Sequence, residues 1–233
     1  LEQSNEVAQA CAHIPNLIFP AYYPAFSCEK VLTMDWMEGK HLSEWCKTNQ
    51  SQESANRIGQ ALWDFYMFQF TKLKKVHADP HPGNFMVNEA EQLIAIDFGC
   101  MKQIPDAFYK PYFELVNADN LNNPAIYSEK LYELEVLRAD DTKEEIVYFS
   151  KFFHELLSVS TLPLQSETFD FSDPKFFGRL AAIGEKYATD KEMKKMNVNR
   201  GSKHFIYINR TFFGLFSLLH DLKANVKTDS FTY

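Results

Sequence analysis

The chain has 233 residues and 45% hydrophobic residues, which is enough to bury the core of one large domain. The formal net charge is −7 and the Lys and Arg residues are scattered among acids, so we expect no nucleic-acid partner. The four cysteines show no Cys-x-x-Cys spacing, which favours free thiols in a reducing, cytoplasmic compartment. The longest apolar run, 212–219, is far shorter than the roughly 18 residues of a membrane-spanning helix.

The first 70 residues predict a strand pair followed by helices. Residues 1–6 read as the inside of a helix without a cap, so we expect more chain upstream. Residues 19–37 are rich in aromatic and β-branched side chains, which predicts two paired strands. A short apolar face at 42–46 and a longer one at 58–70, with spacings of three and four, predict two helices.

The rest of the chain predicts one hairpin and then a helical tail. Residues 85–87 and 93–96 are apolar and flank a polar turn, which predicts a short strand and a buried strand. After about residue 105 the pattern is helical, and Thr142 with Glu145 predicts a capping box. The aromatic stripes of this tail have helical spacing, so we assign them to core packing. The predicted fold class is α+β, mostly α.

Polar residues that suit phosphate chemistry gather between these elements, in HADPHPGN (77–84) and IDFG (96–99). Magnesium prefers oxygen ligands and takes only one or two from the protein when phosphates supply others. Asn84 and Asp97 are the candidate metal ligands, because the predicted hairpin returns the chain from one to the other. Asp79 is the candidate catalytic base, on a loop that Pro80 and Pro82 stiffen.

The spacing His77-x-Asp79-x4-Asn84, followed by Asp97-Phe98-Gly99, is that of a kinase catalytic loop and its magnesium motif. It predicts Mg-ATP phosphoryl chemistry, in which Asn84 counts as both a catalytic and a metal-binding residue. For His77 a scaffold role is favoured over proton transfer. His81 either caps the loop or approaches the substrate, and the sequence leaves this choice open.

These motifs resemble those of the UbiB family, the AarF- or ADCK-type atypical kinases associated with ubiquinone biosynthesis. The segment VLTMDWMEG (31–39) is similar to the family's hinge. The resemblance implies a protein-kinase-like large lobe at 40–233, and the end of the small lobe with the hinge at 1–39. It further implies cofactor-binding roles for Met34 as gatekeeper, for the backbone of Asp35 and Met37 at adenine, and for Glu2 as partner of the ATP-binding lysine.

The chain departs from the family pattern in the features of the small lobe. It contains no Lys-x-Gly-Gln motif, no Ala-rich nucleotide loop and no matching strand lysine, and Lys30 does not replace that lysine. We therefore expect most of the small lobe to lie outside this sequence.

The resemblance implies an ATP-dependent phosphotransferase or ATPase that uses ATP and Mg²⁺. Its substrate would be a small molecule or lipid, handled during isoprenoid-quinone synthesis at the periphery of a membrane. The amphipathic segment 206–222 is the candidate for membrane contact. Two alternatives stay open: a nucleotide-binding pseudokinase that regulates partners, and an aminoglycoside- or choline-kinase-like phosphotransferase. Ala78, Pro80 and Gly99 argue against the second of these.

Overall fold

The computed structural model describes residues 1–193, 196 and 200–229. The α-helices are α1 (Glu2–Cys11), α2 (Leu42–Trp45), α3 (Gln52–Phe68), α4 (Asp106–Glu114), α5 (Ala118–Leu121), α6 (Pro124–Glu133), α7 (Lys143–Ser160), α8 (Pro174–Ala188) and α9 (Lys203–Asp221). The strands are β1 (Leu17–Ile18), β2 (Lys40–His41), β3 (Lys75–His77), β4 (Phe85–Val87), β5 (Leu93–Ala95), β6 (Met101–Gln103), β7 (Thr168–Asp170) and β8 (Asn225–Lys227). Short non-α turns are η1 (Pro24–Phe26), η2 (Gln69–Leu73), η3 (Pro82–Asn84) and η4 (Leu162–Gln165).

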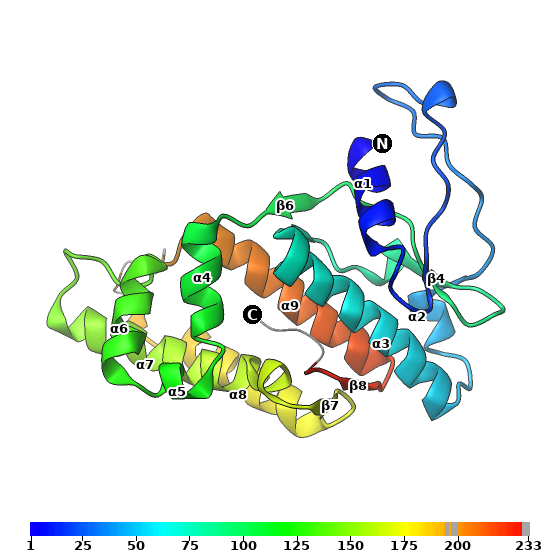
Figure 1. The fold of residues 1–233 in the computed structure, drawn as a ribbon. Helices are drawn as coiled ribbons and strands as arrows, with labels where there is room; N and C mark the ends of the chain where they lie inside the picture. Colours follow the sequence, from blue (N-terminus) through cyan, green and yellow to red (C-terminus); the bar gives the residue numbers. More distant parts are fainter. Residues whose placement is uncertain (194–195, 197–199, 230–233) are drawn as a thin grey trace.

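Two long helices, α3 and α9, lie side by side through the middle of the molecule (Figure 1). Helix α3 begins where the Ser51 side chain accepts a hydrogen bond from the Ser54 N–H, a standard N-cap. Most of its circumference is buried, and the side chains of Trp63, Phe65 and Tyr66 are fully buried. This helix confirms the predicted long helix, and it starts several residues earlier than the apolar pattern indicated because its first turn is polar.

A small sheet and a helical layer lie on either side of this pair of helices (Figure 1). The sheet has the strand order β1-β5-β4-β2, in which β4 and β5 form the predicted antiparallel hairpin and β1 adds parallel to β5. Helices α4 to α8 make the other layer. Helix α7 starts at the predicted capping box of Thr142 and Glu145, which is confirmed. No helix in the described residues is long and apolar enough to cross a membrane.

The aromatic stripes of the tail are core residues, as predicted. Phe153, Phe176, Phe212 and Phe216 are all buried, and Phe212 stacks on Phe70 with ring centroids 4.5 Å apart. The apolar face of α9, the candidate for membrane contact, is used in this packing.

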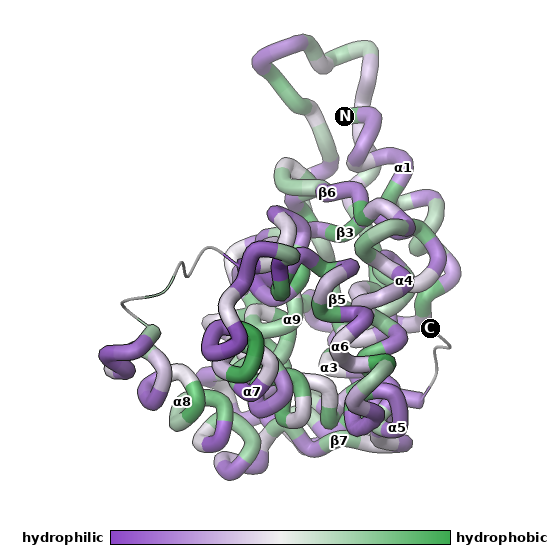
Figure 2. Tube along the Cα trace, turned by 90° about the vertical axis from the view of Figure 1, so that its left-hand side faces the viewer, coloured by the Kyte–Doolittle hydropathy of each residue, from purple (hydrophilic) through white to green (hydrophobic). Residues whose placement is uncertain are grey.

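The predicted strand pair at 19–37 is wrong. This segment holds only isolated bridges, Tyr22 to Met34 and Cys28 to Val31, around the 3-10 turn η1. It extends away from the body beyond the N-terminus (Figures 1 and 2). Phe19 and Tyr22 pack against the core, but the apolar side chains farther along are largely exposed, with Trp36 90% and Phe26 73% exposed.

The prediction of an entirely helical tail is also partly wrong. Strand β7 pairs antiparallel with β8, so the region after residue 105 contains a two-stranded sheet.

A second unpredicted strand pair joins β3 to β6 on either side of the motif region, with Val76 opposite Lys102. Each of the four strands in these two pairs contains a single apolar residue, so none of them shows the apolar run that indicated β4 and β5.

Candidate active site

The β3–β6 strand pair holds the two ends of the segment 77–99 together. In the β3–β6 pair His77 lies opposite Met101, and the Ala78 N–H continues the pairing by donating to the Cys100 carbonyl at 2.8 Å. Asp79 is the residue after Ala78, and the following residue, Pro80, restricts the backbone. The start of the catalytic loop is therefore tied to the residue that follows Asp97-Phe98-Gly99.

The β4–β5 hairpin brings Asn84 and Asp97 together, as the sequence predicted. Phe85 lies opposite Ala95, and the Ile96 N–H donates to the Asn84 carbonyl at 3.1 Å. Asn84 thus neighbours Ile96 across the hairpin, and Asp97 is the next residue along the chain.

Both predicted metal ligands keep an oxygen without a hydrogen-bond partner in the described residues. The Asn84 Nδ2 donates to the Asp79 carbonyl at 3.0 Å, which fixes the amide and leaves its Oδ1 available. Asp97 Oδ1 accepts from the Gly99 N–H at 2.8 Å, and Oδ2 has no such bond. The exposed carboxylate and the half-buried amide fit Mg²⁺ that takes its remaining ligands from phosphates and water.

The described residues contain no group of three or more His, Cys, Asp or Glu side chains that could enclose a metal by themselves. The candidate ligands Asn84 and Asp97 are one amide and one carboxylate, so Mg²⁺ held by them would need further oxygen ligands from phosphates and water.

Asp79 forms an ion pair that sequence reasoning missed. Arg210 of α9 donates from Nη2 to Asp79 Oδ1 at 2.6 Å, while Asp79 Oδ2 has no hydrogen bond among the described residues. The two residues are 131 positions apart, so no local motif connects them. The sequence held only a weak indication that α9 contacts another segment closely. Gly214 lies within an apolar helical segment, and a glycine at such a place usually has a packing reason.

The histidines of the loop take structural positions. His77 is 1% exposed; its backbone N–H donates to the Gln69 side chain and its Nδ1 lies 3.4 Å from the Tyr66 hydroxyl. Burial lowers the pKa of His77, and Asp97 and Asp79 only partly oppose this. A buried, neutral ring fits the scaffold role. His81 Nδ1 accepts from the Gly83 N–H at 3.0 Å, so this ring caps η3.

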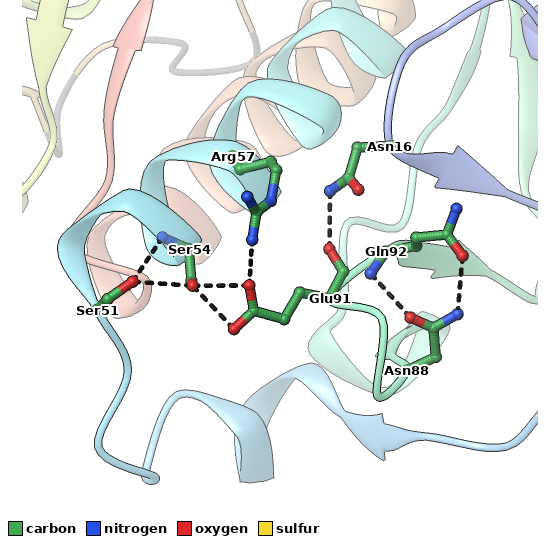
Figure 3. Close-up of polar contacts among 7 residues, drawn as sticks. All are labelled: Asn16, Ser51, Ser54, Arg57, Asn88, Glu91 and Gln92. Carbon is green, nitrogen blue, oxygen red and sulfur yellow. Dashed lines mark hydrogen bonds and ion pairs between the residues drawn. The ribbon is translucent and has the colours of Figure 1, made fainter.

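Glu91, in the turn between β4 and β5, anchors the hairpin to α3 (Figure 3). The Ser54 hydroxyl is 2.8 Å from each oxygen of the Glu91 carboxylate, which also forms an ion pair with Arg57. The Glu91 carbonyl accepts from Asn16 Nδ2 at 2.9 Å. The sequence indicated only a polar turn here, yet these contacts fix the hairpin that carries Asn84.

The predicted nucleotide-binding residues fall into two groups. Glu2 of α1 and Asp97 line one cleft of about 610 Å³, and within the described residues Glu2 makes no ion pair. Met34, Asp35 and Met37 do not line that cleft; Met37 borders a separate hollow of about 770 Å³. The structure therefore places Glu2 in one cleft with Asp97, one of the two candidate metal ligands, whereas Asn84 and these three hinge residues do not line this cleft.

The hinge backbone is nevertheless partly open to hydrogen bonding. The Asp35 N–H donates to the Ala21 carbonyl at 2.9 Å, and the Asp35 carboxylate accepts from the Tyr23 hydroxyl at 2.5 Å. In the described part of the chain, the Asp35 carbonyl and the Met37 N–H have no partner. These two groups are an acceptor and a donor of the kind that an adenine edge requires.

The family model of the ABC1 atypical kinase-like domain matches residues 2–125, a span that contains the whole catalytic loop, the hairpin and Asp97. The chain belongs to this family. The curated relatives include an aarF domain-containing protein kinase of Arabidopsis thaliana, named as chloroplastic and uncharacterized, which is 33% identical over 46% of this chain and 15% of its own length. These matches confirm the UbiB, AarF and ADCK resemblance.

Two other relatives extend the match into the helical tail. The ABC1 family protein of Schizosaccharomyces pombe is 20% identical over 82% of this chain and 44% of its own length. The zebrafish (Danio rerio) atypical kinase COQ8B, named as mitochondrial, is 22% identical over 72% of this chain and 26% of its own. The chain spans less than half the length of each of these relatives. Its cytoplasmic location stays a prediction.

A solved structure confirms the kinase-like fold class. Rv3197 of Mycobacterium tuberculosis, solved as a complex with erythromycin, superposes with a TM-score of 0.73 at 19% identity. The match covers 98% of this chain and 55% of that one. At this identity the likeness supports the α+β, mostly helical, kinase-like fold alone.

Proposed function

We propose that this chain carries the catalytic lobe of an atypical kinase or ATPase that performs Mg-ATP phosphoryl chemistry. Residues 1–39 would be the end of the small lobe with the hinge, and residues 40–233 the large lobe. The observation that carries the proposal is the β4–β5 hairpin, which makes Asn84 and Asp97 near neighbours, each with one side-chain oxygen free of hydrogen bonds, next to the loop that carries the Asp79 carboxylate.

Each residue has a defined part in the proposed reaction. The Asn84 amide and the Asp97 carboxylate are the groups that would hold Mg²⁺, which would supply neutralisation of the charge on the nucleotide phosphates. Asp79 Oδ2 orients an acceptor hydroxyl or a water by accepting its hydrogen bond. Glu2, in the cleft with Asp97, would receive the ATP-binding lysine. The Asp35 carbonyl and Met37 N–H would meet adenine, with Met34 as gatekeeper.

The biological part of the proposal rests on the family resemblance. We propose a small-molecule or lipid acceptor and a role in isoprenoid-quinone (ubiquinone) synthesis, at the surface of a membrane. Flotation of the complete protein with anionic liposomes tests the membrane part, since a protein that stays at the bottom of the gradient contradicts it.

ATP turnover by the complete protein tests the enzymatic part. Asp79→Asn should lower kcat about 100- to 10,000-fold while the affinity for Mg-ADP is retained, because Asp79 acts on the acceptor and not on the metal. Asp173→Asn, which removes a carboxylate from the α8 N-cap, is the charge-matched control and should turn over ATP like the wild type. Unchanged turnover in Asp79→Asn would contradict the role of Asp79, whereas a wild type that binds Mg-ADP without turning over ATP would make a regulatory nucleotide-binding module the better description.

A further inference from the structure

Three residues of α9 form a stripe that faces the catalytic loop. Tyr207, Arg210 and Gly214 have helical spacings of three and four, so they lie on one side of the helix. Tyr207 packs beneath the Lys102 ammonium of β6, Arg210 pairs with Asp79, and Gly214 abuts Pro80. Helix α9 therefore contacts the segment on both sides of the Asp79 carboxylate.

The contact at Gly214 sets how closely α9 approaches the loop. A Cβ at this position would lie 2.1 Å from Pro80 Cγ and 3.2 Å from the Pro80 carbonyl oxygen. On its other side α9 is held by the core, through fully buried Leu215 and through Phe212 stacked on Phe70. The helix is thus fixed from both sides, and it offers Arg210 from a rigid base.

The charge around Asp79 makes this arginine distinctive. From His77 to Asp97 the sequence contains no Lys or Arg, so the catalytic segment has no cation of its own. The Arg210 and Asp79 side chains are 63% and 42% exposed, and ion pairs this exposed contribute little to stability. The ion pair is therefore better explained by its effect on the orientation of the Asp79 carboxylate than by a contribution to stability.

We propose that Arg210 is a positioning residue for Asp79, an inference that rests on the function proposed above. The guanidinium holds Oδ1, which turns Oδ2 toward the acceptor. In the transfer step the acceptor oxygen forms a bond to the γ-phosphorus of ATP while the bond from that phosphorus to the β–γ bridging oxygen breaks. ADP leaves with the electron pair, and the acceptor proton passes to Asp79 Oδ2.

Kinetics and binding on the complete protein test this role. Arg210→Gln should lower kcat for ATP turnover about 10- to 100-fold, the scale expected when a catalytic group is misplaced. The Kd for Mg-ADP and the melting temperature should stay at the wild-type values, because Arg210 touches neither the metal ligands nor the core. Arg210→Lys should recover part of kcat, since an ammonium still pairs with Oδ1 but without the rigid fork.

Two further variants distinguish a positioning role from a general effect of lost charge. Arg179→Gln removes an exposed arginine from α8 and should leave kcat unchanged. Combining Arg210→Gln with Asp79→Asn should reduce kcat no further than Asp79→Asn alone, because Arg210 acts through Asp79.

The outcomes that overturn the inference are distinct from failure of the proposed function. Wild-type kcat in Arg210→Gln, or additive losses in the double variant, overturns the positioning role. A rise in the Kd for Mg-ADP with wild-type kcat at saturating ATP also overturns it, because Arg210 would then be a nucleotide ligand. A wild-type protein that neither binds Mg-ADP nor turns over ATP overturns the proposed function, and the assignment of Arg210 with it.

Discussion

Gly214 of α9 lies directly against Pro80, the residue that follows the candidate base Asp79. The pyrrolidine ring of Pro80 is rigid, so it cannot move aside for a side chain as a lysine tip would. The contact joins the helical tail to the catalytic loop, and it makes the tail part of the site.

Gly214→Ala should destabilise the protein and lower ATP turnover. The new methyl group would lie 2.1 Å from Pro80 Cγ, so α9 or the loop must shift. Overpacking of this kind costs about 1–3 kcal/mol of unfolding free energy. The same shift displaces Arg210 from Asp79, so kcat should fall as well. Urea denaturation and steady-state kinetics of the variant measure the two effects.

Gly178→Ala in α8 is the matched control. A Cβ at Gly178 meets nothing within 4 Å, so the substitution should stabilise α8 by up to about 1 kcal/mol through helix propensity. Equal effects of the two substitutions would show that Gly214 is not needed for the close contact.

The buried ion pair of Arg200 and Asp141 should be a principal determinant of stability. Arg200 Nη1 donates to Asp141 Oδ1 at 2.5 Å, with the side chains 3% and 4% exposed, and the guanidinium lies over the Phe149 ring. Burial raises the pKa of Asp141, but the hydrogen bond from Arg200 and the backbone of Arg138 lower it more, so the net pKa is lowered.

Arg200→Met should therefore lower the unfolding free energy by about 3–5 kcal/mol, because it leaves the Asp141 carboxylate buried without its partner. Arg57→Met removes the more exposed pair with Glu91 and should cost no more than about 1 kcal/mol. Urea denaturation of both variants makes the comparison. Similar losses would contradict the importance of burial at Arg200.

His77 should make stability depend on pH near neutrality. Burial lowers its pKa in the folded protein, so the unfolded chain takes up a proton at higher pH than the folded chain does. The stabilisation is complete above the unfolded pKa of about 6.5 and is lost as the pH falls through the lowered folded pKa. Denaturation from about pH 8 to about pH 5.5 should show a smaller loss in His77→Gln than in the wild type. Parallel losses would mean that His77 is not responsible.

The catalytic segment was predictable because its information is local. Two short apolar runs around a polar turn indicate the β4–β5 hairpin, and that hairpin alone brings Asn84 to Asp97. The capping box at Thr142 likewise depends on residues three apart. Such features follow from the nearby sequence, so their prediction needs no knowledge of the tertiary fold.

The errors arose where tertiary context decides. The segment 19–37 has the composition of strands, but beyond Tyr22 most of its apolar side chains are not covered by the core, and it forms only isolated bridges. The Arg210–Asp79 pair joins residues 131 positions apart, and nothing near either residue indicates the other. The Glu91 anchor was missed for the same reason, because Ser54 and Arg57 belong to a different element.

Calorimetric titration of Mg-ADP into the complete protein tests the central claim most directly. The wild type should bind with a heat that disappears when EDTA removes the metal, and Asp97→Asn should abolish this magnesium-dependent binding. Glu89→Gln, which removes an exposed charge from the turn of the same hairpin, should bind like the wild type. Magnesium-dependent binding that survives Asp97→Asn, or no binding by the wild type, would contradict the account.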